Sequence, residues 1–143
     1  MVEIQALASK TTFGYPNRTV SGFDLNRLKL LIAVLERRTK LNLSDQDIFV
    51  NVVGGIKLND SGADLAICLA IASAVAGRKL DEGYVVFGEV GLGGEIRSAF
   101  RPDQRISEAK KLGFTHAIAP ATVRDKFVIP VRDLRETLIR HVK

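Results

Sequence analysis

The chain has 143 residues, 46% of them hydrophobic, and its 21 Lys and Arg against 16 Asp and Glu give a formal net charge of +5. These values are typical of a single globular domain with an adequate core, and they exclude a disordered chain. The only cysteine, Cys68, excludes an internal disulfide, and one cysteine with two distant histidines excludes the usual zinc cluster. We therefore expect no metal, whereas the positive charge is compatible with a nucleic acid partner.

The apolar stretches of the chain are too short, and too often interrupted by polar residues, to span a bilayer. The N-terminal segment MVEIQALASK has neither the basic region nor the long apolar region of a signal peptide. We therefore expect a cytoplasmic protein with no membrane partner. Met1 is followed at once by a predicted strand, which suggests a domain cut out of a longer protein, although a genuine short protein could begin in the same way.

The first part of the chain predicts two strands and a helix. Apolar and polar residues alternate over Val2–Ala8, the period of a half-buried strand, and after a loop rich in turn residues Arg18–Phe23 predicts a second strand. Asp24 is placed to cap a helix over Leu25–Lys40. Apolar residues at helical spacing predict the buried stripe of that helix, namely Leu28, Leu31, Ile32 and Leu35.

The middle of the chain predicts a strand and a buried helix. Asp47–Leu58 is rich in β-branched residues, as strands are. Ser61 and Asp64 then match the capping-box spacing at the start of a helix that ends near Gly77. Because this helix is apolar nearly all round, we expect it to be the central buried helix of the domain.

The last part of the chain alternates short strands with helices. The expected elements are a strand over Tyr84–Val90, a turn over Gly91–Gly94, a partner strand from Glu95 to Arg97, a helix over Pro102–Leu112 ended by Gly113, strands over His116–Ala119 and Lys126–Ile129, and a helix over Val131–Val142. No internal repeat or linker interrupts this order, which favours one α/β domain, a mixed sheet with packed helices.

Two features invite a catalytic interpretation. The glycines from Gly88 to Gly94 lack the order of a dinucleotide-binding loop and favour a tight hairpin, and no GxxxxGK[ST] motif supplies a phosphate-binding loop for ATP. Ser61 is a candidate nucleophile if a general base lies beside it, although helix capping explains the same residue. His116 and His141 have no Asp or Ser at an informative spacing, so the sequence predicts no triad.

Basic residues within structured, otherwise apolar segments point in directions that the fold determines. Four such residues are candidates for a patch that binds phosphates: Arg18, Arg27, Lys57 and Arg97. The alternative is that they are scattered solvated charges, or ion-pair partners of Asp60, Asp64 and Glu95, and the pattern alone slightly favours this alternative.

Six segments, in this order, carry a resemblance to a known family: VEIQAL, NRLKLLIAVLERR, DIFVNVVGGIK, ADLAICLAIASAVAGR, VVFGEVGLGGEIR and RISEAKKLGF. Together they resemble the C-terminal domain of the RadA (Sms) family of bacterial DNA repair proteins, over nearly the whole chain and more weakly after Ala121. That domain is similar to the proteolytic domain of Lon proteases. The resemblance therefore implies a Lon-protease-like fold over residues 1–143.

Lon proteases use a catalytic dyad of serine and lysine, and the resemblance implies that this dyad is missing here. Its alignment places Gly62 at the serine position and Asp103 at the lysine position. Glycine has no attacking atom, and aspartate carries the opposite charge to lysine. A shift of one residue would bring in Ser61 as the nucleophile of a residual peptidase, but Arg105, which is always protonated, would be a poor base.

The resemblance also implies a larger parent protein with a zinc finger and a RecA-like ATPase, neither of which is in this chain. Members of the family form hexameric rings that act on branched recombination intermediates and promote branch migration. ATP, magnesium and zinc are then expected only in the missing parts, with no cofactor in this domain. We expect the domain to bind single-stranded and branched or duplex DNA and to associate into rings, with the parent contacting a recombinase filament. A subunit-interaction module without DNA binding is the remaining alternative.

Overall fold

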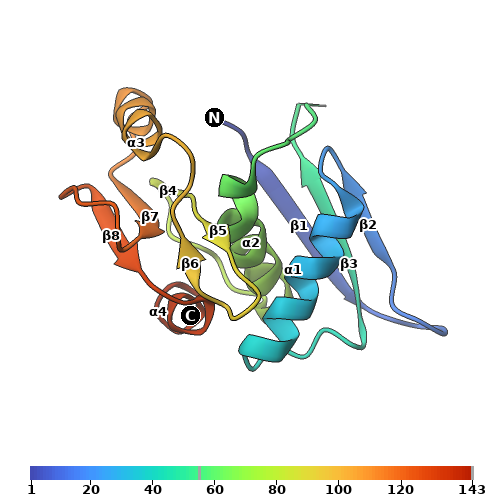
Figure 1. The fold of residues 1–143 in the computed structure, drawn as a ribbon. Helices are drawn as coiled ribbons and strands as arrows, with labels where there is room; N and C mark the ends of the chain where they lie inside the picture. The colour runs from blue at the N-terminus through green and yellow to red at the C-terminus, as the bar shows by residue number, and fades with distance from the viewer. Residues whose placement is uncertain (55, 143) are drawn as a thin grey trace.

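A computed structural model describes residues 1–54 and 56–142, and these form a mixed α/β domain with strands on two sides of a central helix (Figure 1). The elements in chain order are β1 (Ile4–Lys10), β2 (Arg18–Ser21), α1 (Leu25–Arg38), β3 (Gln46–Val52), the 3-10 turn η1 (Ser61–Ala63), α2 (Asp64–Ala76), β4 (Tyr84–Val86), β5 (Glu89–Val90), β6 (Ile96–Arg97), α3 (Pro102–Lys111), β7 (His116–Pro120), β8 (Val128–Val131) and α4 (Leu134–His141).

The first sheet has the strand order β1-β3-β2, with β3 antiparallel to β1 and parallel to β2. Residues of β3 alternate between the two faces, so that Ile48, Val50 and Val52 are buried whereas Phe49 and Asn51 are exposed. The predicted strand over Asp47–Leu58 is therefore right in place but too long. The chain turns at Val53 and Gly54, and Gly55 lies outside the described residues.

The second sheet is parallel, with the order β4-β7-β8, and β5 and β6 form a separate hairpin. The prediction of one strand over Tyr84–Val90 is wrong, because the chain leaves the sheet at Phe87 and Gly88. The N–H of Gly88 donates to the carbonyl of Gly62 at 2.8 Å, and its carbonyl accepts from the N–H of Leu65 at 3.0 Å. This backbone contact brings the chain against the start of α2. The predicted turn at Gly91–Gly94 is confirmed.

The helix caps agree with the sequence at α1 and at the end of α2. The Asp24 side chain accepts from the N–H of Arg27, and Gly77 ends α2 with a φ of 65°. The predicted capping box of Ser61 and Asp64 is wrong. Asp60 caps η1 by accepting from the N–H of Gly62, and among the described residues no side chain caps α2. The Ser61 hydroxyl instead donates to Glu89, and the Asp64 carboxylate accepts from Arg27 and from the N–H of Val90.

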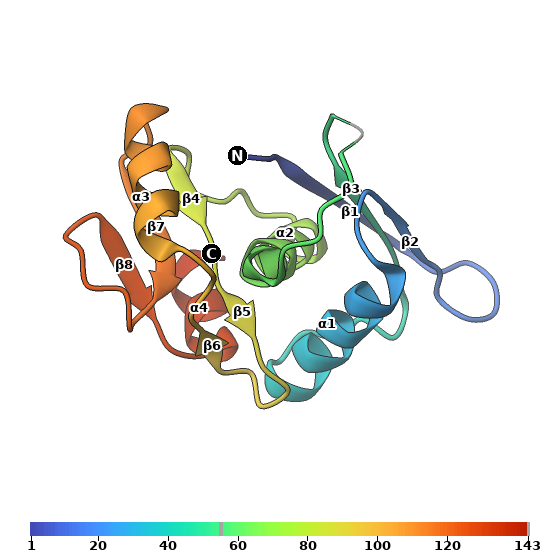
Figure 2. The same cartoon turned by 45° about the horizontal axis from the view of Figure 1, so that its top comes forward.

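Helix α2 lies at the centre of the molecule, between the first sheet and the hairpin (Figure 2). Leu65, Ile67, Leu69 and Ile71 are fully buried, which confirms the predicted central helix. The buried stripe predicted for α1 is also confirmed. Cys68 is fully buried in α2, and this burial raises the pKa of its thiol. Within the described residues, no helix is long and apolar enough to cross a membrane.

Candidate functional site

A buried carboxylate, Asp64, joins three elements at the start of α2. It is inaccessible to solvent, and its Oδ1 accepts from Nε of Arg27 on α1 at 3.1 Å. Its Oδ2 accepts from Nη2 of Arg27 and, at 3.1 Å, from the N–H of Val90 on β5. The hydrogen bond to Asp64 raises the pKa of the Arg27 guanidinium. This pair binds α1, α2 and the hairpin together.

A second ion pair connects the N-cap of η1 with α3. Nη2 of Arg105 contacts Oδ2 of Asp60 at 2.6 Å, and Nε of Arg105 donates to the carbonyl of Phe100 at 2.7 Å. The other oxygen of Asp60 accepts from the N–H of Gly62. The Arg105 guanidinium also lies 5.8 Å from the ring centroid of Phe87. Each end of this pair is thus held by further contacts.

Because Gly62 has no side chain, the guanidinium of Arg105 can lie against it. A Cβ atom added at Gly62 would lie 2.8 Å from Nη2 and 2.9 Å from Cζ of Arg105, and 3.0 Å from Cβ of Ala99. A side chain at position 62 would therefore displace the guanidinium. The space where a side chain at position 62 would lie is thus occupied by the guanidinium of Arg105, which is always protonated.

Asp103 does not face Gly62, although the sequence alignment predicted it for the lysine position of a dyad. It is exposed in the first turn of α3, where a carboxylate favours the positive end of the helix. Ile106 and Ala109 define the buried side of α3, and Arg105 lies next to that side. The helical period thus turns Asp103 outward and directs Arg105 towards η1.

Ser61 faces a carboxylate. Its Oγ donates to Oε2 of Glu89 at 2.9 Å, which is the one hydrogen bond of this hydroxyl in the part of the chain that the structure describes. His116 lies instead in the second sheet, where its ring contacts Tyr84 and Phe127. No group of three or more His, Cys, Asp or Glu among residues 1–54 and 56–142 could hold a metal ion.

The structure separates the four predicted basic residues into two kinds. Arg18 and Arg27 are tied inside the fold. Nη2 of Arg18 donates to the carbonyl of Leu43 at 2.9 Å and its Nη1 to that of Gln46, while Arg27 binds Asp64.

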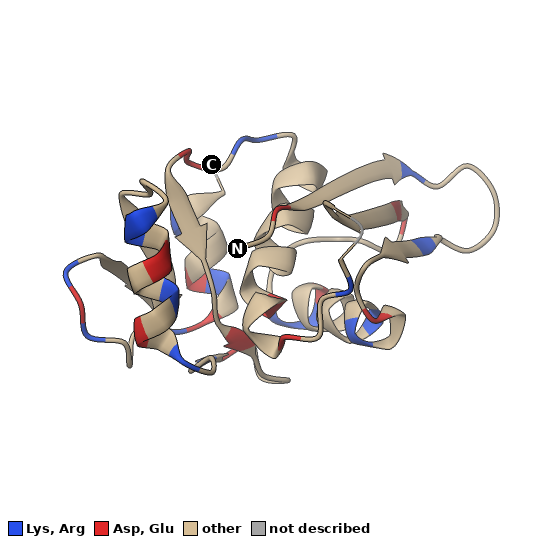
Figure 3. Cartoon of the chain, turned by 90° about the horizontal axis from the view of Figure 1, so that it is seen from above, with Lys and Arg blue, Asp and Glu red and all other residues tan. Residues whose placement is uncertain are grey.

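Lys57 and Arg97 lie at the surface. Arg97 has a 59% exposed side chain that pairs with Glu95 at 2.8 Å, and Lys57 is exposed. Two of the ion pairs named as the alternative, Arg27 with Asp64 and Arg97 with Glu95, are therefore present. Lysines and arginines lie on both halves of the molecule, among acidic residues (Figure 3).

The sequence placed Arg105 beside Ser61 only as a poor base and did not predict its ion pair with Asp60, nor Glu89 as the partner of Ser61. Arg105 lies 45 positions from Asp60, and Glu89 lies 28 positions from Ser61. Neither spacing has a meaning in a linear pattern. The one local signal was Gly62 itself, a glycine at the start of a buried helix where no turn requires one.

A family model described as "Subunit ChlI of Mg-chelatase" matches residues 5–123. The chain belongs to the ChlI family. Among curated proteins, the ChlI-family chain is 52% identical over 121 residues to DNA repair protein RadA of Salmonella typhimurium strain LT2, which covers 85% of this chain and 26% of that protein. Over 121 residues it is also 51% identical to DNA repair protein RadA of Escherichia coli K12, with 85% and 26% covered.

A third relative, DNA repair protein RadA of Haemophilus influenzae strain Rd, is 46% identical over 144 residues, covering 96% of this chain and 31% of that protein. The predicted resemblance to proteins of this name is confirmed. The ChlI-family chain thus spans about a quarter to a third of the length of these curated relatives.

Proposed function

We propose that this chain is a DNA-binding and subunit-association domain, without peptidase activity, of a RadA-type DNA repair protein. The observation that carries the proposal is its 52% identity to a protein of that name. In this proposal residues 1–143 form a C-terminal, Lon-protease-like domain of the parent. The parent is a cytoplasmic, hexameric ATPase that acts on branched recombination intermediates, and its partners include a recombinase filament.

The geometry around Gly62 supports the absence of peptidase activity. The position that the resemblance gives to the nucleophile has no side chain, and the guanidinium of Arg105 fills the space beside it. Ser61 donates to Glu89, and this hydrogen bond joins its hydroxyl to a carboxylate, not to the neutral lysine that a dyad needs. ATP, magnesium and zinc belong in this proposal to the parts of the parent outside this chain, which lacks a phosphate-binding loop.

We assign different parts to the four basic residues. Lys57 and Arg97 contact DNA phosphates directly, because their side chains are exposed. Arg18 and Arg27 act through the fold, since their guanidinium groups hold the β3 and α2 segments from which the surface is built. Binding of this kind is independent of sequence and weakens with salt.

Fluorescence anisotropy with labelled duplex and single-stranded DNA over a series of salt concentrations tests this proposal. Each phosphate contact contributes about 0.9 to the slope of log K against log salt for duplex DNA. Lys57→Ala and Arg97→Ala should each lower that slope by about this amount, whereas Lys79→Ala, which removes an exposed lysine after α2, should leave it unchanged.

Two outcomes contradict the proposal. One is that the chain does not bind DNA at low salt, and the other is that the double variant of Lys57 and Arg97 binds DNA as the wild type does. Light scattering in the same buffers distinguishes the remaining possibility, which is assembly of the subunits without any affinity for DNA.

A further inference from the structure

The turn between β5 and β6 encloses the carboxylate of Glu95. A Cβ atom added at Gly91 would overlap Oε1 and Cδ of Glu95, and one added at Gly93 would lie 2.6 Å from Oε2. Both carboxylate oxygens therefore lie in space that two glycines leave open. We call this space, bounded by Gly91, Gly93 and the Arg97 guanidinium, the turn cradle.

The groups that hold this carboxylate are those that bind phosphates. Nη2 of Arg97 donates to Oε1 of Glu95 at 2.8 Å, and Nε of Arg97 lies 3.0 Å from the position of a Cβ atom added at Gly91. Hydrogen bonds from its own N–H, from Arg97 and from the N–H of Gly93 lower the pKa of the Glu95 carboxyl. A guanidinium and the backbone N–H groups of a turn form binding sites for phosphate in many proteins.

A second arginine borders the turn from α1. Nε of Arg38 donates to the carbonyl of Leu92 at 3.2 Å, and a Cβ atom added at Gly94 would lie 3.1 Å from Cβ of Arg38. Figures 1 and 2 show the turn beside the C-terminal end of α1. Cations from two different elements thus lie at this turn, which favours the binding of an anion there.

The Glu95 side chain can leave the turn cradle without unfolding the domain. It is 43% exposed, and the side chain of its partner Arg97 is 59% exposed. Exposed ion pairs of this kind contribute little to stability. A phosphodiester has one negative charge and two free oxygens, as a carboxylate has, so it can accept the same hydrogen bonds in place of Glu95.

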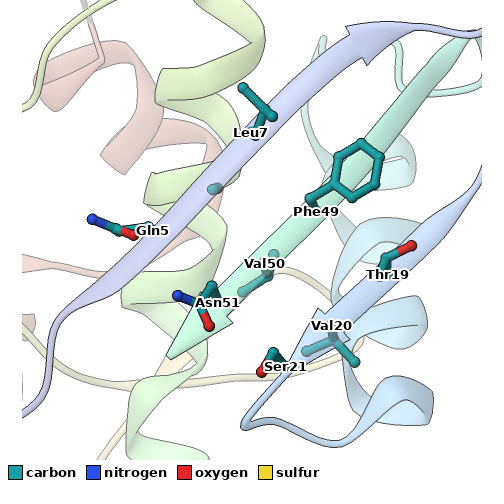
Figure 4. A pocket seen from close by; sticks show the side chains of 9 residues that line it. Gln5, Leu7, Thr19, Val20, Ser21, Phe49, Val50 and Asn51 are labelled. Carbon is teal, nitrogen blue, oxygen red and sulfur yellow. The ribbon is translucent and has the colours of Figure 1, made fainter. Parts of the chain in front are cut away.

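The groove on the outer face of the first sheet, of about 670 Å³, is a poor site for an anion (Figure 4). None of its lining residues carries a positive charge. Side chains alternate along β3, so the carboxylate of Asp47 lies on the same face as Phe49 and Asn51. The turn cradle, in contrast, combines cations with a bound carboxylate.

We propose that the turn cradle is a phosphate site, occupied by the Glu95 carboxylate in the free domain and by a DNA phosphodiester in the complex. Glu95 is then an internal competitor of DNA for Arg97. The inference rests on the proposed function, in which Arg97 contacts DNA phosphates. It adds the cradle that receives one phosphate and the residue that limits the affinity of this site.

Anisotropy with labelled duplex DNA tests the competition. Glu95→Gln keeps the size of the side chain but removes its charge, and Kd should fall roughly two- to fivefold, the effect of releasing an exposed ion pair. Glu136→Gln is the matched control, because Glu136 forms a similarly exposed pair with Arg140 inside α4, and Kd should not change. In an Arg97→Ala background, Glu95→Gln should gain clearly less affinity.

Nuclear magnetic resonance of the ¹⁵N-labelled domain reports on the turn cradle itself. Duplex DNA should shift the amide signals of Gly93 and Glu95, because their N–H groups pass from the carboxylate to a phosphate. Gly91→Ala places a methyl group in the cradle and should weaken DNA binding, with circular dichroism to verify its fold. Inorganic phosphate at equal ionic strength should shift the same two amides only weakly.

Three results would overturn the inference. Equal gains in Glu95→Gln and Glu136→Gln would show that net charge alone sets the affinity. DNA binding that leaves the Gly93 and Glu95 amides unshifted would place the phosphate elsewhere, and a cradle that inorganic phosphate saturates while DNA has no effect would be a site for free phosphate. In each case the proposed function stands if Arg97→Ala still lowers the salt slope, whereas no binding to any DNA contradicts both.

Discussion

The guanidinium of Arg27 binds both oxygens of the fully buried Asp64 carboxylate. Asp64 also accepts from the backbone of Val90, so one carboxylate holds two helices and a strand together. A buried charge without its partner is costly, because the interior solvates it poorly. Arg27, which the sequence predicted to bind DNA, therefore serves to hold these elements of the fold together.

Arg27→Ala should lower the free energy of unfolding by about 3 to 5 kcal/mol, since it leaves Asp64 buried without its counter-ion. Arg97→Ala removes the same charge from an exposed pair and should cost at most about 1 kcal/mol. Urea denaturation followed by circular dichroism measures both values. Equal losses in the two variants would show that the buried pair has no special part in stability.

Gly62→Ala should destabilise the fold by about 1 to 3 kcal/mol, because the added methyl group overlaps the guanidinium of Arg105. In an Arg105→Ala background the same substitution should cost clearly less. A double-mutant cycle on unfolding free energies measures this difference. Additive effects of the two substitutions would mean that Arg105 does not limit the space at position 62.

Cys68 should not react with a thiol reagent in the folded protein at pH 8, because burial raises the pKa of its thiol and keeps the thiol neutral. The unfolded chain in denaturant should react at once. Release of a chromophore from a disulfide reagent follows both reactions. Rapid labelling under native conditions would contradict the buried position of this side chain.

The same thiol should make the fold less stable at high pH. The pKa of the Cys68 thiol is higher in the folded chain than in the unfolded chain. The contribution of this thiol to stability is therefore complete below its pKa in the unfolded chain, and it decreases above about pH 8.5, where the thiol of the unfolded chain ionises. The free energy of unfolding should then decrease by up to about 1.4 kcal/mol per pH unit. Cys68→Ala should lack this part of the slope, and an identical slope in both proteins would assign it to other groups.

Chymotrypsin should first cleave the folded chain after Phe13. Phe13 and Tyr15 are 90% and 92% exposed in the loop between β1 and β2, and exposed loops are preferred sites of limited proteolysis. Cleavage after Tyr15 should be slow, because Pro16 follows it. Mass spectrometry of the early products identifies the site, and Phe13→Ala should delay it. An earlier cut within α2 would indicate that the core opens first.

The sequence by itself determined the elements whose signals are local. The alternation over β1, the cap at Asp24, the helix end at Gly77 and the apolar surface of α2 each depend on residues a few positions apart, because strand period, helix period and caps are short-range properties. The motifs in order were likewise enough for the resemblance to proteins named RadA, which the relatives confirm.

Only the tertiary structure decided which side chains meet at the start of α2. Ser61 binds Glu89, Asp64 binds Arg27, and Arg105 rather than Asp103 lies against Gly62. The break in the predicted strand at Gly88 has the same origin, since its backbone bonds to the start of α2. A local preference for a cap or a strand is worth only about 1 kcal/mol and depends on neighbouring residues, whereas these contacts join segments that are far apart in the sequence.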